Sequence, residues 1–160
     1  MDIHYSPIGY FETEFKDLQD MPIQPSGAKD IEGRIVVNEE FADGLKDLDG
    51  FSHIIVLSHM HASSGYKLHV KPFLDDTPRG VFSTRAPKRP NSIGLSILQL
   101  VKVEKNQLIV RGVDLLDSTP VLDIKPYVAD FDSCDADRFG WLEGKGEKVV
   151  EKKSDDRFID

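Results

Sequence analysis

Residues 84–95 carry the clearest chemical signal in the chain, a run of three cations among residues that restrict the backbone. The segment reads Thr-Arg-Ala-Pro-Lys-Arg-Pro-Asn-Ser-Ile-Gly-Leu, with the cations at Arg85, Lys88 and Arg89. Unpaired charges are costly to bury, so we expect an exposed loop. The two prolines fix φ at their own positions and bias the preceding residues toward extended backbone. A stiff loop that holds cationic donors in place suits recognition of an anion or a nucleotide.

A second segment, residues 114–127, could hold a ligand at the edge of a sheet. Its first half, Asp-Leu-Leu-Asp-Ser-Thr-Pro, is typical of a turn between strands. In its second half Asp123 and Lys125 alternate with apolar residues, which predicts one charged strand face. Pro126 ends backbone pairing and places Tyr127 at a rim. A carboxylate, an ammonium group, a freed carbonyl and an aromatic ring together could bind a purine.

The histidines offer a weaker, metal-site hypothesis. His53, His59 and His61 share parity, so an unbroken strand would place them on one face, and His69 could add a ligand to the His59–His61 pair. No carboxylate lies near them in sequence. We therefore expect no metal, and a metal-dependent enzyme that uses His59, His61 and His69 stays a minor alternative.

Motifs of several common enzyme classes do not occur in the sequence. It has no Gly-x-Gly-x-x-Gly after a strand, no Gly-Lys-Ser/Thr phosphate loop and no Gly-x-Ser-x-Gly elbow. The single cysteine, Cys134, excludes an internal disulfide. A Rossmann-type cofactor site and acyl-transfer chemistry are therefore not expected.

Short apolar runs between turn residues must position these segments, and they predict a mainly β protein. Residues 39–48 form the best short-helix candidate, because Phe41, Leu45 and Leu48 recur at helical spacing. Many short strands favour a closed or nearly closed antiparallel β-barrel with short helices. Residues 66–73 are expected to pair with 51–60, and Lys105-Asn106 to form a hairpin turn. The expected strands span residues 7–11, 33–37, 51–60, 66–73, 80–83, 97–104, 107–113 and 121–124.

Composition bounds the class of protein and its partners. A chain of 160 residues, 39% hydrophobic and 30% charged, is expected to form about one domain. The apolar runs are far shorter than the roughly 20 residues that span a bilayer, and the first residues lack a secretory pattern, so we expect a cytoplasmic protein without a membrane partner. Residues 51–100 carry six basic and two acidic side chains, although the whole chain has a net charge of −8. This basic region is either a solvated face or a surface for a polyanion.

Residues 84–95 and residues 114–127 both closely resemble the signature of the TrmO (YaeB-like) family. The resemblance extends to Pro7-Ile8-Gly9, to Pro22-Ile23-Gln24-Pro25 and to residues 50–61, and it covers residues 5–130 in the expected order. It implies a β-barrel domain over residues 1–130 and a C-terminal extension over residues 131–160. The family is known for homodimeric, S-adenosylmethionine-dependent methyltransferases. They modify the N6 of threonylcarbamoyladenosine beside the anticodon of threonine tRNA.

The resemblance also implies roles for particular residues. It carries cofactor contacts onto the following positions: Pro22, Ile23, Gln24, His61, Ala62, Arg85, Leu95, Leu122, Asp123, Ile124 and Lys125. Ile23 stands where the family often has arginine, and Ala62 replaces a common polar residue. Arg85 is the natural partner for the methionine carboxylate of the cofactor.

Catalytic and RNA-binding residues follow from the same comparison and from residue chemistry. The N6 atom is a poor nucleophile, so some group must accept its proton; the candidates are Asp114, Asp123 and Tyr127. Contacts with tRNA are expected from Lys88 and Arg89 at the crest of the loop, and from Lys67 and Lys71. The alternative to an enzyme is a non-catalytic nucleotide- or RNA-binding regulator on the same barrel.

Overall fold

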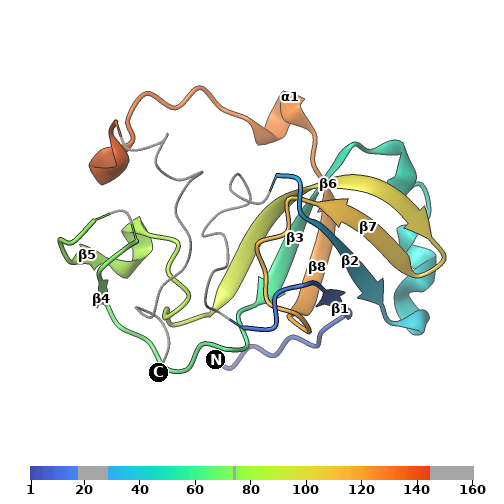
Figure 1. Cartoon of the computed structure of the whole chain (residues 1–160), viewed down its shortest axis with the longest axis horizontal. Helices are drawn as coiled ribbons and strands as arrows, with labels where there is room; N and C mark the ends of the chain where they lie inside the picture. Colours follow the sequence, from blue (N-terminus) through green and yellow to red (C-terminus); the bar gives the residue numbers. More distant parts are fainter. Residues whose placement is uncertain (18–28, 74, 145–160) are drawn as a thin grey trace.

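Six antiparallel strands form a closed barrel, which confirms the fold class expected from the sequence. The computed structural model describes residues 1–17, 29–73 and 75–144 (Figure 1). The strands follow one another around the barrel in the order β1-β2-β7-β6-β3-β8, and β8 returns to β1. Their bounds are β1 Gly9–Glu12, β2 Glu32–Val37, β3 His53–His59, β6 Ile93–Glu104, β7 Gln107–Arg111 and β8 Pro120–Pro126.

The barrel is filled by every second residue of its strands. In β3, Ile54, Val56 and Ser58 are fully buried, while the residues between them face outward. Successive side chains of a strand point to opposite faces, so the alternation follows from strand geometry. The same pattern supplies the rest of the core, including Phe11, Ile35, Leu98, Leu108, Val110 and Val121.

The helix expected over residues 39–48 is wrong in kind and in extent. The structure has two 3₁₀ helices there, η2 (Glu39–Leu45) and η3 (Leu48–Gly50). Lys46 has extended ψ, and Asp47 has a left-handed φ of 66°. These two residues end the first helical segment before a regular α-helix can form.

The expected pairing of residues 66–73 with 51–60 is also wrong. Both edges of β3 are already used, by β6 and by β8. The chain instead leaves the barrel and forms a small lobe, residues 62–73 and 75–92, built on the ribbon of β4 (His69–Val70) and β5 (Arg79–Gly80) and on η4 (Val81–Ser83). The lobe has its own apolar cluster of Val70, Val81 and Ala86, with Phe73 against it.

Residues 129–144 run from the end of β8 across to the lobe (Figure 1). They include α1 (Ala129–Asp132) and η5 (Gly140–Leu142). Trp141 Nε1 donates a hydrogen bond to Ser83 O at 2.8 Å, and the Arg79 guanidinium lies 5.7 Å from the centre of the indole ring. The segment is therefore anchored two residues before Arg85. Within the described ranges, no helix has the length and apolar character to cross a membrane.

We expect Trp141→Ala to loosen the lobe near Arg85. The variant loses a hydrogen bond and a cation–π contact, which together contribute about 1–2 kcal/mol. Hydrogen–deuterium exchange of the amides of residues 81–85 should accelerate, and Trp141→Phe should restore only part of the protection. Leu142→Ala, at the neighbouring position, is the control. Equal exchange in wild type and Trp141→Ala would show that the anchor has no such role.

Candidate functional site

Strand register brings two predicted cofactor residues together on the outer face of the barrel. Leu57 pairs with Leu95 of β6 on one side and with Asp123 of β8 on the other. The three side chains therefore form one cross-strand row, since paired residues share a face. Leu95 is 53% exposed although it is aliphatic. An apolar wall next to a carboxylate suits a ligand with both apolar and polar parts.

The other predicted cofactor residues of β8, Leu122, Ile124 and Lys125, lie next to Asp123, but they differ in which groups they could offer a ligand. Lys125 Nζ forms an ion pair with Asp123 Oδ2 at 2.6 Å. Ile124 packs its side chain against the core, while its N–H donates to Asp123 Oδ1 at 2.9 Å. Leu122 lies at an irregularity in the register with β3 and is half-buried. Ile124 can therefore offer a ligand mainly its backbone.

One edge of β8 is open along this run. In the part of the chain that the structure describes, β1 pairs with β8 only at Pro120 and Val121. Beyond them lies an apolar groove of about 560 Å³, whose lining includes Ile8, Leu48, Phe51, Asp123, Ile124 and Pro126. A planar heterocycle could hydrogen-bond to the backbone of this edge and pack against the apolar wall.

The turn with His61 and Ala62 lies against the end of the cationic loop. The Met60 N–H donates to Ser92 O at 2.8 Å, and the His61 N–H donates to His59 O at 2.8 Å. Gly94 permits this approach, because a β-carbon there would lie 2.8 Å from both Met60 Sδ and Ser58 Oγ. The turn breaks the strand parity on which the histidine metal hypothesis depended. Among residues 1–17, 29–73 and 75–144, no group of three or more potential metal ligands is brought together.

The crest of the cationic loop differs from its expected arrangement. Lys88 is only 5% exposed, so the exposed position expected for its side chain is wrong. Arg89 Nη1 donates to Thr84 O at 3.0 Å and to Ala86 O at 3.4 Å. The physical reason is local, because the guanidinium binds carbonyls that the two prolines leave without a regular partner. Arg89 thus stiffens the loop and Lys88 is buried in it, whereas Lys67 and Lys71 lie exposed on the lobe.

Asp114 is the most perturbed carboxyl of the site. Burial raises its pKa to about 7, and the hydrogen bond within the residue and the charge of nearby Arg85 offset only part of that rise. Its Oδ1 atom is buried and has no hydrogen-bond partner among the described residues. A carboxyl that exchanges its proton near neutral pH, beside a cation, has the properties of a general base.

The three predicted catalytic residues are spread along β8 and the segments that flank it. Asp114 precedes β8, Asp123 lies within it, and Tyr127 follows its last residue. A strand of this length spans about 20 Å. The Tyr127 N–H donates to His53 O at 3.0 Å, and the two rings pack edge to face with centroids 6.4 Å apart. Asp114 and Tyr127 therefore belong to opposite ends of the barrel.

Sequence reasoning missed an aliphatic surface on β3 and β6. Ile55 pairs with Ile97, and His59 with Ile93, so the row through Leu57 and Leu95 has apolar neighbours on both sides. Ile93 and Ile97 are each 42% exposed. The signal was present, because these strands are apolar at both alternating positions, a pattern typical of strands covered on both faces.

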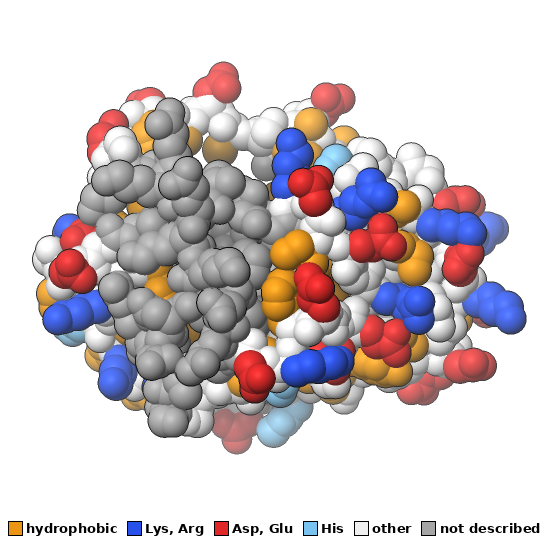
Figure 2. Space-filling model, viewed as in Figure 1, with side chains coloured by type: hydrophobic (Ala, Val, Ile, Leu, Met, Phe, Trp, Pro, Cys, Tyr) orange, Lys and Arg blue, Asp and Glu red, His pale blue; other side chains and the backbone are white. Residues whose placement is uncertain are grey.

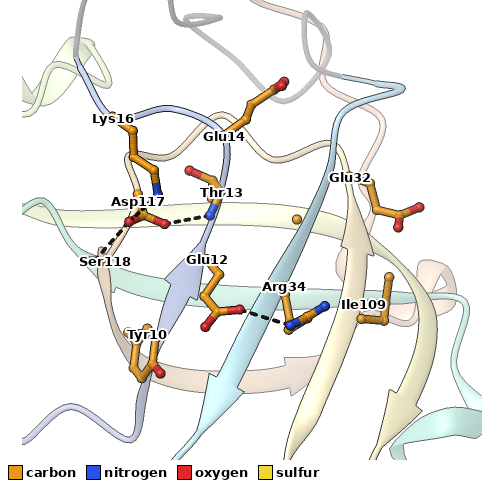
Figure 3. Close-up of a pocket in the computed structure, with 11 residues that line it drawn as sticks. Tyr10, Glu12, Thr13, Glu14, Lys16, Glu32, Arg34, Ile109, Asp117 and Ser118 are labelled. Carbon is orange, nitrogen blue, oxygen red and sulfur yellow. Dashed lines mark hydrogen bonds and ion pairs between the residues drawn. The ribbon is translucent and has the colours of Figure 1, made fainter.

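The opposite side of the barrel carries paired charges instead. Figure 2 shows Lys and Arg side chains interspersed with Asp and Glu over the face with β1, β2 and β7. In a hollow on this face Arg34 binds Glu12 at 3.2 Å, while Asp117 accepts from Lys16 at 2.7 Å and from the Thr13 N–H at 2.9 Å (Figure 3). Because these charges satisfy one another, the hollow is a weaker candidate site than the opposite face. The predicted residues Pro22, Ile23 and Gln24 lie outside the described residues.

Comparisons of the sequence with known protein families and proteins give consistent matches. The family model of the tRNA-methyltransferase O N-terminal domain matches residues 10–133. The chain is 49% identical over 157 residues to a probable S-adenosyl-L-methionine-binding protein of Pyrococcus abyssi, a match that covers 98% of this chain and 85% of that protein. It is 44% identical to the tRNA (adenine(37)-N6)-methyltransferase of Mus musculus, covering 79% of this chain and 31% of the mouse protein.

A solved structure agrees with the sequence comparisons. The crystal structure of TrmO from Pseudomonas aeruginosa superposes with a TM-score of 0.74 at 37% identity. The match covers 88% of this chain and 63% of the TrmO chain, so this chain spans less than two-thirds of that protein. The fold is thus similar, the family model matches most of the chain, and the chain belongs to the TrmO family.

Proposed function

We propose that this protein is an S-adenosylmethionine-dependent tRNA methyltransferase. Its proposed substrate is the N6 of threonylcarbamoyladenosine beside the anticodon of threonine tRNA, in the cytoplasm. The observation that carries the proposal is geometric: Leu95, Leu57 and Asp123 meet in one row on the outer face of the barrel. Asp114 adds a half-buried carboxyl near Arg85, and burial raises its pKa to about 7.

The proposed cofactor site combines the outer face and the open edge of β8. The residues fit the cofactor, because within the described ranges no strand pairs with this edge of β8 beyond Val121, where adenine could bind, and the groove next to it is apolar. Asp123 suits the ribose or the sulfonium, and Arg85 suits the methionine carboxylate. Leu95 supplies apolar contact. We place the further contacts at Pro22, Ile23, Gln24, His61, Ala62, Leu122, Ile124 and Lys125.

Asp114 is the proposed base of the reaction. When bound, the cofactor would supply an electrophilic methyl group for direct transfer to N6. Asp114 would accept the N6 proton on a carboxylate oxygen. Because the reaction is a direct transfer, positioning of the two partners should dominate the rate.

The aliphatic surface on β3 and β6 supports a homodimer as the working form. Exposed Ile93, Leu95 and Ile97 form a contiguous apolar row with Ile55 and Leu57. Soluble proteins rarely leave such a row uncovered. Since Leu95 belongs to both the row and the proposed cofactor set, the cofactor would lie at the edge of the interface.

We expect Arg85→Ala to weaken binding of S-adenosylmethionine by about 10- to 100-fold. Hydrogen bonds to charged groups contribute about 1.5–3 kcal/mol, and Arg85→Lys should restore part of the affinity. Isothermal titration calorimetry measures the effect. The variant should also shift the pH–rate profile upward, because Arg85 lowers the pKa of Asp114. An Arg85→Ala protein that binds the cofactor normally would refute this role.

The proposed activity is tested with threonine tRNA that carries threonylcarbamoyladenosine. Mass spectrometry after incubation with protein and cofactor should show the nucleoside heavier by one methyl group. The second candidate, a binding protein without catalysis, is favoured by the name of the Pyrococcus abyssi relative, which mentions binding only. Tight cofactor binding without any methylated nucleoside would support that second candidate.

A further inference from the structure

The lobe exposes aromatic side chains that the proposed cofactor site does not use. Tyr66 is 62% exposed and Phe82 is 75% exposed, and Leu68 is 57% exposed. The Val81 N–H donates to Leu68 O at 2.9 Å, which extends the pairing of β4 with β5. The segments that carry the two rings therefore lie side by side.

These rings lie within the basic part of the chain. Residues 62–92 contain six Lys and Arg residues but only two acids, Asp75 and Asp76. Asp75 is already bound to Arg79 at 2.6 Å. Lys67 and Lys71 are exposed on the same lobe. Aromatic rings among cations are typical of surfaces that bind single-stranded nucleic acid.

We propose that Phe82 and Tyr66 form a stacking platform for unpaired bases of the RNA substrate. The inference rests on the proposed function, in which the modified base lies in an anticodon loop. Proteins recognise such loops by stacking splayed bases on aromatic rings, while nearby cations bind the phosphates. The platform is separate from the aliphatic row on β3 and β6, whose neighbouring cation, Lys125 of β8, is already paired with Asp123.

The test separates stacking from charge by the salt dependence of binding. The probe is an anticodon stem-loop RNA, compared with a fully paired duplex of the same length. Phe82→Ala should bind the stem-loop at least about fivefold more weakly with an unchanged salt slope, because a base stack releases no counterions. Phe82→Tyr should bind as wild type. Lys67→Gln with Lys71→Gln should instead reduce the salt slope by about one for each cation.

Phe131→Ala is the matched control, because Phe131 is also 75% exposed but lies on α1, outside the lobe. Sedimentation and thermal unfolding confirm that each variant keeps its assembly and its fold. Unchanged stem-loop affinity in Phe82→Ala overturns the proposal, as does a loss that accompanies a changed oligomeric state. Equal losses on the stem-loop and on the duplex also overturn it. If RNA binding depends on the ring but no methyl transfer occurs, the platform is supported and the proposed enzyme activity is refuted. If methyl transfer occurs and Phe82→Ala leaves the KM for RNA unchanged, the enzyme activity is supported and the platform is refuted.

Discussion

Asp114→Asn is expected to abolish most methyl transfer while making the protein more stable at neutral pH. Loss of a general base typically costs a hundredfold or more in rate, about 10²–10⁴. In the wild type, the rate should rise with pH through about 7, as the carboxyl loses its proton. The asparagine variant should lack that rise. Single-turnover methylation of tRNA across the pH range measures both effects.

The stability effect follows from the direction of the pKa shift. The pKa of Asp114 is about 7 in the folded protein and about 3.9 in an unfolded chain. Between those values the folded state binds more protons, so wild-type stability should fall as pH rises from about 4 to 7. Since one pKa unit corresponds to about 1.4 kcal/mol, the variant should gain on the order of 2–4 kcal/mol at pH 8. Denaturant unfolding at pH 4 and pH 8 tests the difference.

Asp117 supplies a matched control in the same loop. Hydrogen bonds from Lys16 and from the Thr13 N–H hold the pKa of Asp117 below its ordinary value. Its contribution to stability is therefore present above the unfolded pKa and is lost as the pH falls. Asp117→Asn should lower stability at neutral pH and leave the methylation rate nearly unchanged. If both variants lose stability at neutral pH and keep activity, Asp114 is a structural residue and the base must be sought elsewhere.

The positions of the barrel strands could be predicted from the sequence because their cause is local, whereas the strand expected over 80–83 is the 3₁₀ helix η4 from Val81 onward and that over 66–73 is reduced to His69–Val70. Alternation in residues 53–59 and 107–111 reports which side chains enter the barrel, whatever their partners are. The 39–48 helix failed because helical spacing says nothing of a residue such as Asp47 with left-handed φ. The pairing expected for residues 66–73 failed because β8, which begins 61 residues after the end of β3, already occupies that edge of β3.

The site was predictable only as far as residue types reveal it. Asp123, Lys125 and Leu95 stand in recognisable motifs, and strand register brings Leu95 and Asp123 to one row beside Leu57. The burial of Lys88 could not be predicted, because a charged residue in a cationic segment is expected to be exposed, and its burial depends on how the lobe packs. The unusual pKa of Asp114 was hidden as well. It depends on burial and on Arg85, which lies 29 positions earlier in the sequence.

If the proposed homodimer forms through the aliphatic row, Ile97→Glu is expected to convert it into a monomer and to weaken cofactor binding in parallel. Ile97 is 42% exposed at the centre of the aliphatic row, paired with Ile55. An unpaired carboxylate buried in an interface costs several kcal/mol, which corresponds to association weaker by roughly a thousandfold. Sedimentation velocity measures the dimer, and calorimetry measures the cofactor affinity.

Ile109→Glu is the control for that charge, because it makes the same substitution on the outer face of another strand. Ile109 pairs with Arg34 on the charged side of the barrel, where a carboxylate gains a cation as neighbour. This variant should stay dimeric and bind the cofactor normally.

If Ile97→Glu stays dimeric as well, the aliphatic row is not the interface. If it becomes monomeric but keeps its cofactor affinity, each protomer binds the cofactor alone, and the partner serves only the RNA. Loss of both properties together would show that Leu95 reaches its ligand only when the second copy covers the row.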